Sequence, residues 1–181
     1  MRRINSNYVT SLRLFLGPLA CILLANGRLE WALIAMVAGE LTDAIDGFVA
    51  RNGRGVSEWG KLYDPLCDAI FNMSVWAGFL ALGWIPAYLL VLFVGRDIAT
   101  SYMRAGLASR GVVMAARISG KVKMVAQAIA QVGAVFLHVC IGKNPFGLAL
   151  VWVAAFITAI SLIDYGQDFL RRARKTGLFG R

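Results

Sequence analysis

Residues 29–50 read LEWALIAMVAGELTDAIDGFVA. This stretch is long enough to cross a membrane as a helix, because a spanning helix needs about 20 mostly apolar residues. It nevertheless carries two acids near its end, Asp43 and Asp46. An ionisable side chain at the bilayer centre costs at least about 2.5–3.5 kcal/mol, so acids in such a stretch mark a candidate functional site. The stretch therefore predicts a membrane-spanning helix, and its acidic end is a candidate functional site.

The rest of the chain has the same apolar character. Of its 181 residues, 59% are hydrophobic and 16% are charged, and the mean hydropathy is +0.65. A soluble domain is about 45–50% apolar and about 25% charged, so the composition excludes a soluble globular protein, a disordered chain and a disulfide scaffold. Candidate spans lie at 8–25, 29–50, 60–82, 85–107, 121–141 and 146–165. We predict an all-α integral membrane protein, a six-transmembrane-helix bundle that forms one membrane-embedded domain over residues 1–181.

The positive charge predicts how this bundle is oriented. The chain has 19 Lys and Arg against 10 Asp and Glu, a formal net charge of +9, and every cation except Arg28 and Lys143 falls on one side of the predicted bundle. Short loops rich in Lys and Arg stay cytoplasmic, so we expect both termini in the cytoplasm. Because the cations flank membrane segments, we expect membrane lipids as partners, with residues 171–175 against anionic headgroups, and no nucleic acid.

Two further acids, Asp64 and Asp68, open the third span. Side chains three or four residues apart share one face of a helix. Asp43 therefore lies on the same face as Asp46, and Asp64 on the same face as Asp68. The 51–57 connection would bring the two helices together as a hairpin. Converging acids repel unless they are protonated or hold cations, and all-oxygen ligands suit hard divalent cations such as Mg²⁺ or Mn²⁺. From spacing alone, a metal site, an ion pathway of a transporter and structural acid–base pairs all remain open.

The four acids belong to a longer pattern. It reads Asp43-x2-Asp46-Gly47-x2-Ala50-Arg51, then eight residues, then Gly60-x3-Asp64-x3-Asp68. This pattern resembles the signature of the CDP-alcohol phosphotransferase (CDP-alcohol phosphatidyltransferase) family at all eight fixed positions. The resemblance implies a transferase in which an alcohol hydroxyl attacks the β-phosphorus of a CDP-linked lipid and CMP leaves. It also implies the bacterial inner (plasma) membrane, with the active site at the cytoplasmic face.

The resemblance carries roles over to individual positions. It implies a two-metal site for Mg²⁺ or Mn²⁺, with the ligands Asp43, Asp46, Asp64 and Asp68. Asp68 would also act as the general base, since a carboxylate can remove the acceptor's proton while divalent ions neutralise the pyrophosphate. The positions implied for CDP binding are Asn7, Thr10, Gly47, Arg51, Ser57 and Gly60.

Six cations in the second half predict a pocket for an anionic acceptor. They are Arg96, Arg104, Arg110, Arg117, Lys121 and Lys123. The positive-inside rule accounts for each of them taken alone. The run 96–127 and the opening 7–13 are similar to the phosphatidylglycerophosphate synthases of bacterial members of the family. That likeness implies CDP-diacylglycerol as donor and glycerol 3-phosphate as acceptor, with inositol phosphate or another polar alcohol as the alternative.

Two expectations concern class and assembly. An ion-coupled membrane transporter is the alternative of a different class, although a proton path needs neither Arg51 nor Gly60 at this spacing. The resemblance implies a homodimer, formed through the third and fourth spans. The large aromatic residues of those spans would lie at that interface or face lipid: Trp76, Phe79, Trp84, Tyr88 and Phe93.

Overall fold

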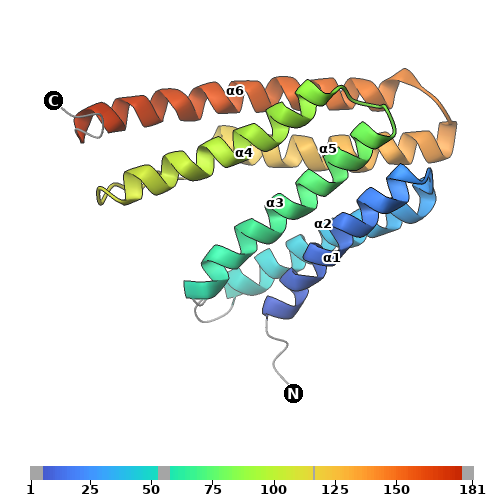
Figure 1. Ribbon diagram of the computed structural model, residues 1–181. Coiled ribbons are helices and arrows are strands. Elements are labelled where there is room, and N and C mark those ends of the chain that lie inside the picture. Colours follow the sequence, from blue (N-terminus) through green and yellow to red (C-terminus); the bar gives the residue numbers. More distant parts are fainter. Residues whose placement is uncertain (1–5, 53–57, 116, 177–181) are drawn as a thin grey trace, which may run out of the picture.

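The computed structural model describes residues 6–52, 58–115 and 117–176. The side chains at 6–10, 43–52, 58–62 and 64 lie outside this description. Within it the chain is all-helical, and its helices are joined by short connections (Figure 1). In chain order they are α1 (Ser6–Ala25), α2 (Leu29–Asn52), α3 (Glu58–Ala81), α4 (Ala87–Ala108), α5 (Ile118–Ile141) and α6 (Pro145–Lys175). The all-α prediction is confirmed for these residues.

The predicted breaks between helices have clear local causes. Gly27 follows α1 with φ of 68° and Gly142 follows α5 with φ of 78°, a backbone conformation that favours glycine. Asn144 then caps α6, because its side chain accepts a hydrogen bond from the Gly147 N–H at 3.1 Å. Pro145 stands at the first position of α6, where no backbone N–H is needed. These residues turn the chain back on itself, so that neighbouring helices run antiparallel.

The helices form two halves. In one half α1 packs against both α2 and α3, and in the other α6 packs against both α4 and α5. Contacts of α2 with α5 and of α3 with α4 join the halves (Figure 1). The first half is tight, since a Cβ added to Gly17 would lie 2.7 Å from the Phe71 Cα. The absence of a side chain at this glycine lets α1 approach the backbone of α3.

Aromatic rings fill the core where α3 meets α4. The rings of Trp76 and Phe93 stack with centroids 4.0 Å apart, and Phe79 meets Trp76 edge-on at 5.3 Å. Each of these three residues is at most 1% exposed. The expectation that they lie at a dimer interface or face lipid is therefore wrong, because they hold the two halves of one protomer together. Tyr88, at 62% exposed, does lie on the surface.

The outer surface is apolar enough for a membrane protein. Large hydrophobic side chains such as Phe15, Trp31, Val91 and Phe156 are more than half exposed. Among the residues described, α5 and α6 are the two helices long and apolar enough to cross a membrane, while Ser11–Ala25 and Pro65–Ala81 are shorter apolar segments. The structure thus supports a membrane protein, and the number of spans stays a prediction.

Helix α6 is longer than the sixth predicted span. The span was expected to end at Tyr165, but the helix continues to Lys175 and has 31 residues. At 1.5 Å per residue it is about 46 Å long, against about 30 Å of hydrocarbon core. Its last ten residues include an i,i+4 pair in which Arg172 Nε donates to Asp168 at 2.9 Å. The polar residues that end the apolar stretch therefore do not end the helix.

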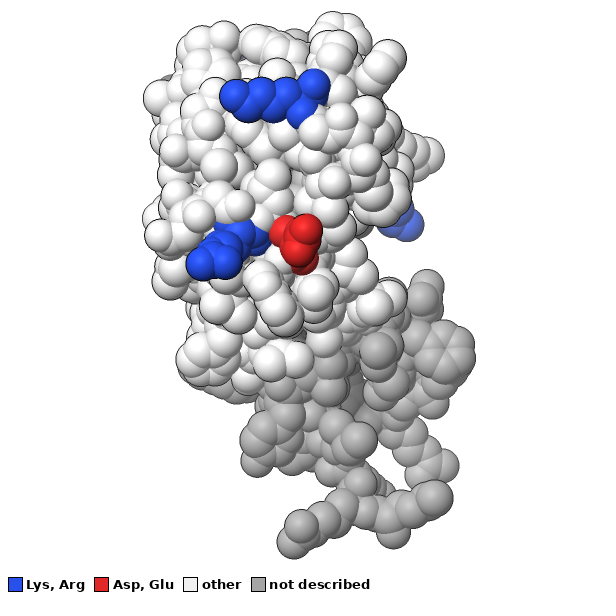
Figure 2. Space-filling model, turned by 90° about the vertical axis from the view of Figure 1, so that its right-hand side faces the viewer, with Lys and Arg blue, Asp and Glu red and all other residues white. Residues whose placement is uncertain are grey.

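The connections are sorted to two ends of the molecule. Both described chain ends and the α4–α5 connection lie at one end, and the α1–α2 and α5–α6 connections lie at the other (Figure 1). Figure 2 looks onto the latter end, and the residues coloured there show few charged side chains. This agrees with the uneven charge of the sequence, in which that side carries only Arg28 and Lys143 of the cations.

Candidate active site

A cavity of about 460 Å³ lies where the two halves meet, and we call it the polar chamber. Five helices, α1 to α5, contribute to its wall. Its volume falls within the range of small-molecule sites, about 300–1,000 Å³. The charged and amide side chains of the wall are Arg13, Glu40, Asp68, Asn72, Arg96, Asp97, Arg104, Lys123 and Gln127. Such a wall suits a phosphorylated polar molecule.

Asp68 and Arg13 meet in the wall of this chamber. Arg13 Nη1 donates to Asp68 Oδ1 as an ion pair between α1 and α3. The Arg13 guanidinium also lies 5.6 Å from the centre of the Phe71 ring. The Arg13 side chain is only 4% exposed, so the first helix supplies a buried cation beside the acid. The structure thus places one of the four signature acids at the chamber, with positive charge next to it.

The other signature positions are described less fully. The backbone is helical at Asp43 and Asp46 in α2 and at Asp64 in α3, and their side chains lie outside the description. Ser57 lies outside the described residues altogether. The same limit on side chains applies to the remaining positions expected to bind CDP: Asn7, Thr10, Gly47, Arg51 and Gly60. A helical backbone at spacings of three and four does keep each pair of acids on one helix face.

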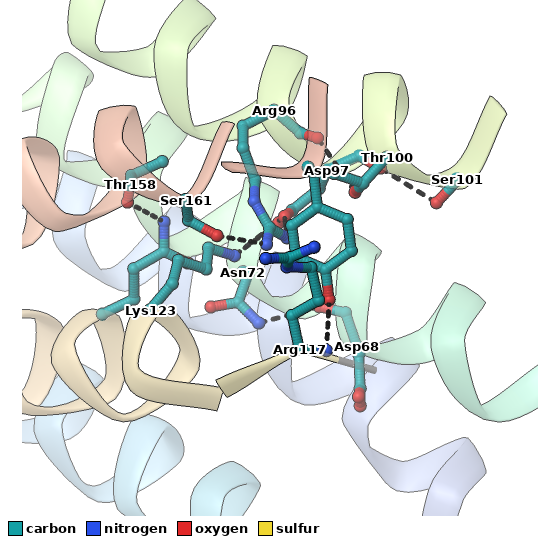
Figure 3. A network of polar contacts seen from close by, with 12 residues as sticks. Asp68, Asn72, Arg96, Asp97, Thr100, Ser101, Arg117, Lys123, Thr158 and Ser161 are labelled. Carbon is teal, nitrogen blue, oxygen red and sulfur yellow. Dashed lines mark hydrogen bonds and ion pairs between the residues drawn. The ribbon is translucent and has the colours of Figure 1, made fainter. Parts of the chain in front are cut away.

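Arg96 and Lys123 meet at a single carboxylate, that of Asp97 (Figure 3). Lys123 Nζ lies 2.9 Å from Oδ1 and 2.8 Å from Oδ2 of Asp97. Arg96 Nη1 donates to the same Oδ1 at 2.9 Å, and Arg96 Nη2 donates to Ser161 on α6 at 2.7 Å. The Lys123 and Arg96 side chains are 4% and 9% exposed. Since buried cations are costly without a partner, Asp97 allows both to stay at the wall.

Tyr165 organises the arginines on the same side of the chamber. Its hydroxyl accepts hydrogen bonds from Arg104 Nη2 and from the backbone N–H of Arg117, both at 3.0 Å. The guanidinium groups of Arg96 and Arg104 lie 5.0 Å and 5.4 Å from its ring centre, within the range of cation–π attraction. Tyr165 is 1% exposed, so a fixed ring holds two cations in place.

The structure brings half of the predicted acceptor-binding cations to the chamber. Arg96, Arg104 and Lys123 line it, and Arg110, Arg117 and Lys121 do not. Arg110 and Lys121 are exposed. Arg117 is engaged by α6, since its Nε donates to Asp164 at 2.7 Å and its Nη1 lies 3.4 Å from Asp168. Acceptor binding by the three cations outside the wall stays a prediction from the sequence.

A polar stripe on α5 extends inward from the chamber. Lys123, Gln127 and Gln131 follow one another at a spacing of four and share one helix face. Gln127 Nε2 donates to Thr158 at 3.3 Å, and Gln131 Nε2 donates to Asn72 at 3.3 Å. All three stripe residues are buried, at 3% exposed or less. The stripe ties α5 to α3 and α6 at the inner end of the site.

Sequence reasoning missed several residues of this site, among them Arg13, Asp97 and Tyr165. Arg13 stands three residues after Thr10, so helical spacing was a usable signal for it. Asp97 was an acid within an apolar stretch, which is a usable signal as well. Tyr165 offered none, because its role comes from contacts with arginines on other segments that are distant in sequence.

These features define a class of protein, a helical membrane protein with a polar, cation-lined site that suits a phosphorylated substrate. Comparison with known families is consistent with this, because residues 3–160 match the family described as CDP-alcohol phosphatidyltransferase. The chain belongs to this family. The membership expected from the eight-position signature is therefore confirmed, and the protein is a transferase by family.

Several similar proteins span most of the chain. A CDP-diacylglycerol–glycerol-3-phosphate 3-phosphatidyltransferase of Bacillus subtilis (strain 168) is 32% identical over 177 residues, covering 88% of this chain and 91% of its own. A probable phosphatidylglycerophosphate synthase of Mycobacterium tuberculosis (strain H37Rv) is 31% identical over 176 residues, covering 93% and 80%. A protein of Rickettsia typhi with the same name as the Bacillus relative is 28% identical over 166 residues, covering 88% and 93%.

Members of this family generally depend on divalent metal ions. The residues of this chain fit such an ion, because the signature acids supply only carboxylate oxygens, the donors that hard cations such as Mg²⁺ prefer. Asp68, the acid whose side chain is described, already lies beside the positive charge of Arg13. A metal ion at this place would be bound by carboxylate oxygens, and it would compete with Arg13 for Asp68.

Proposed function

We propose that this protein transfers the phosphatidyl group of CDP-diacylglycerol to glycerol 3-phosphate, giving phosphatidylglycerophosphate and CMP. The observation that carries the proposal is the position of Asp68, a signature acid, in one chamber with Arg96, Arg104 and Lys123. Arginine and lysine bind phosphate groups through charge-assisted hydrogen bonds, so the wall suits an anionic alcohol. The names of the relatives favour glycerol 3-phosphate as that alcohol.

The bond changes assign work to particular residues. The acceptor's hydroxyl oxygen bonds to the β-phosphorus, the bond from that phosphorus to the bridging oxygen breaks, and CMP leaves with this oxygen. Asp68 takes the hydroxyl proton as general base. The cations of the wall hold the acceptor's phosphate, which brings its hydroxyl toward the reacting phosphorus and lowers the entropic part of the barrier. Arg13 donates a hydrogen bond to Asp68 and so orients this carboxylate at the chamber wall.

Metal and nucleotide binding complete the proposal. Asp43, Asp46, Asp64 and Asp68 would hold two divalent ions, Mg²⁺ or Mn²⁺. When bound, such ions neutralise the pyrophosphate and stabilise the charge of an in-line displacement. The CDP group would contact the signature residues Gly47, Arg51 and Gly60 together with Asn7, Thr10 and Ser57.

The arrangement in the membrane is part of the same proposal. We expect six spans in the bacterial inner membrane, with both termini and the active site at the cytoplasmic face. The position of both described chain ends at one end of the molecule supports an even number of spans. A homodimer through α3 and α4 is expected as well, and exposed apolar residues on those helices, Met73, Tyr88 and Val91, are available for it.

An acceptor panel tests the proposed function. Purified protein in detergent receives CDP-diacylglycerol, Mg²⁺ or Mn²⁺ and one acceptor at a time: glycerol 3-phosphate, an inositol phosphate, glycerol or inositol. We expect phosphatidylglycerophosphate from glycerol 3-phosphate, with one CMP released per lipid formed. The two uncharged alcohols should give little product, because they lack the phosphate that the cations bind. Product from inositol phosphate alone would reassign the acceptor, and no CMP with any acceptor would contradict the chemistry.

A further inference from the structure

The cluster that joins Arg96, Asp97 and Lys123 has a role beyond the family signature. Resting on the proposed function, we propose that Asp97 is a positioning residue for the acceptor. Its carboxylate would hold Lys123 and Arg96 in the orientation in which they bind the acceptor's phosphate. Asp97 is not itself a ligand for the phosphate, because two negative groups repel each other.

The hydrogen bonds of the two cations leave donors for a ligand. A lysine ammonium has three N–H donors, and the two oxygens of Asp97 lie within 2.9 Å of the Lys123 ammonium. Arg96 uses Nη1 for Asp97 and Nη2 for Ser161, while its buried Nε has no hydrogen-bond partner among the described residues. A guanidinium has five N–H donors, so Nη1 and Nη2 of Arg96 each keep one N–H beyond those bound to Asp97 and Ser161, and these can donate to an acceptor oxygen at the wall.

The cluster also fixes three helices at one point. Asp97 and Arg96 come from α4, Lys123 from α5 and Ser161 from α6, and Figure 3 shows the first three side chains pointing toward one another. Both cations touch the same Oδ1 of Asp97, so without this carboxylate they would repel each other at close range. We therefore expect removal of the Asp97 charge to separate Lys123 from Arg96.

The direction of the effect distinguishes positioning from simple neutralisation. If Asp97 only lowered the positive charge of the chamber, Asp97→Asn would make the wall more cationic. The KM for an anionic acceptor would then fall or stay unchanged. If Asp97 positions the cations, the same change raises that KM, because the donors no longer converge on one phosphate.

The experiment measures kcat and KM of purified Asp97→Asn, Asp97→Glu and wild-type protein with glycerol 3-phosphate. We expect Asp97→Asn to raise the acceptor KM at least about tenfold, while the KM for CDP-diacylglycerol changes less than about twofold. Asp97→Glu keeps the charge but moves it by one methylene, so we expect a smaller rise of about threefold. Asp164→Asn is the matched control. Asp164 also accepts from an arginine and a serine, but it lies outside the chamber wall, and its acceptor KM should not change.

A double variant tests whether Asp97 acts through Lys123. In a Lys123→Met background we expect Asp97→Asn to raise the acceptor KM by far less than it does in the wild type, since one of its two partners is gone. Equal effects in the two backgrounds would overturn the proposal, as would an acceptor KM that is unchanged or lowered in Asp97→Asn. If Asp97→Asn does not fold, an unchanged acceptor KM in Asp97→Glu overturns it. A wild-type protein that makes no phosphatidylglycerophosphate contradicts the proposed function instead, so the two failures are distinguishable.

Discussion

Arg13 carries a full charge within the first helix, and a charged side chain in an apolar segment of a membrane protein is costly and rare. Its guanidinium pairs with Asp68 and lies over the Phe71 ring, so charge and packing both hold it. The pair links α1 to Asp68, one of the two signature acids of α3. At the scale of single residues, the site thus contains three buried cations, Arg13, Arg96 and Lys123, each held by an acid.

Replacement of Arg13 by alanine tests this link. We expect Arg13→Ala to lower the free energy of unfolding by about 1–3 kcal/mol, because Asp68 loses a charged hydrogen-bond partner in a partly buried place. The rate of CMP release should fall as well. Thermal unfolding in detergent and a CMP assay measure the two effects. Arg28→Ala removes an exposed arginine at the α1–α2 connection and should change neither. Wild-type stability and rate in Arg13→Ala would refute the role of the pair.

At the scale of elements, glycine determines how closely helices approach. A Cβ on Gly120 of α5 would lie 2.7 Å from the Tyr165 hydroxyl oxygen of α6. That hydroxyl is held by Arg104 and by the backbone of Arg117, so it cannot move freely. The contact between α5 and α6 is therefore coupled to the position of an arginine in the chamber wall.

Gly120→Ala tests this coupling. We expect a loss of about 1–3 kcal/mol in the free energy of unfolding, since the added methyl overpacks against a buried ring. The acceptor KM should rise too, because the displaced Tyr165 no longer orients Arg104. Gly166→Ala is the control, because Gly166 follows Tyr165 in α6. An added Cβ there meets nothing within 4 Å, and alanine favours the helix. If both variants unfold at the same temperature, the packing explanation fails.

Much of the helical plan could be predicted from the sequence. Apolar stretches bounded by glycine gave the six helices and their breaks, because φ values such as that of Gly27 are unfavourable for other residues. The extension of α6 beyond Tyr165 could not be predicted from hydropathy. A hydropathy pattern indicates where an apolar stretch ends, and a helix can continue past that point. The polar end of α6 is held by Arg117, which contacts Asp164 and Asp168 from more than forty residues away in sequence. Such pairings are invisible to spacing within one helix.

The candidate site also has one part that could be predicted from the sequence and one part that could not. The acid signature follows short, regular spacing and was found from the sequence. The cationic wall does not, because the partner of Lys123 is Asp97 on another helix, 26 residues away. Charge alone gave six equivalent cations, and only the packing of the two halves separates the three at the chamber from the three outside it.

At the scale of the whole molecule, the chamber lies at the junction of the two halves. Stacking of Trp76 on Phe93 holds α3 against α4, and the ion pair of Asp97 and Lys123 holds α4 against α5. The described chain ends lie at one end of the molecule (Figure 1), and the described residues at the other end carry little charge (Figure 2). The proposed orientation rests on this asymmetry, because segments rich in Lys and Arg stay cytoplasmic.

Cysteine labelling in intact cells tests the orientation. In a background in which Cys21, Cys67 and Cys140 are replaced by alanine, Lys143→Cys should react with a membrane-impermeant thiol reagent added from outside. Lys175→Cys should react only after the membrane is opened, because positively charged segments remain cytoplasmic. Labelling of both variants after membrane opening is the positive control. The opposite pattern would place the termini outside and reverse the proposed topology.

The most direct measurement of the central claim is CMP release by Asp68→Asn. The variant is compared with the wild type and with Asp168→Asn, which removes an acid of α6 that is paired outside the chamber wall. Each protein receives CDP-diacylglycerol, a divalent metal ion and glycerol 3-phosphate. A general base contributes about 10²–10⁴-fold to a rate, so we expect Asp68→Asn to release CMP at least about 100-fold more slowly. Asp168→Asn should stay near the wild-type rate. Release of CMP by Asp68→Asn at the wild-type rate would contradict the account.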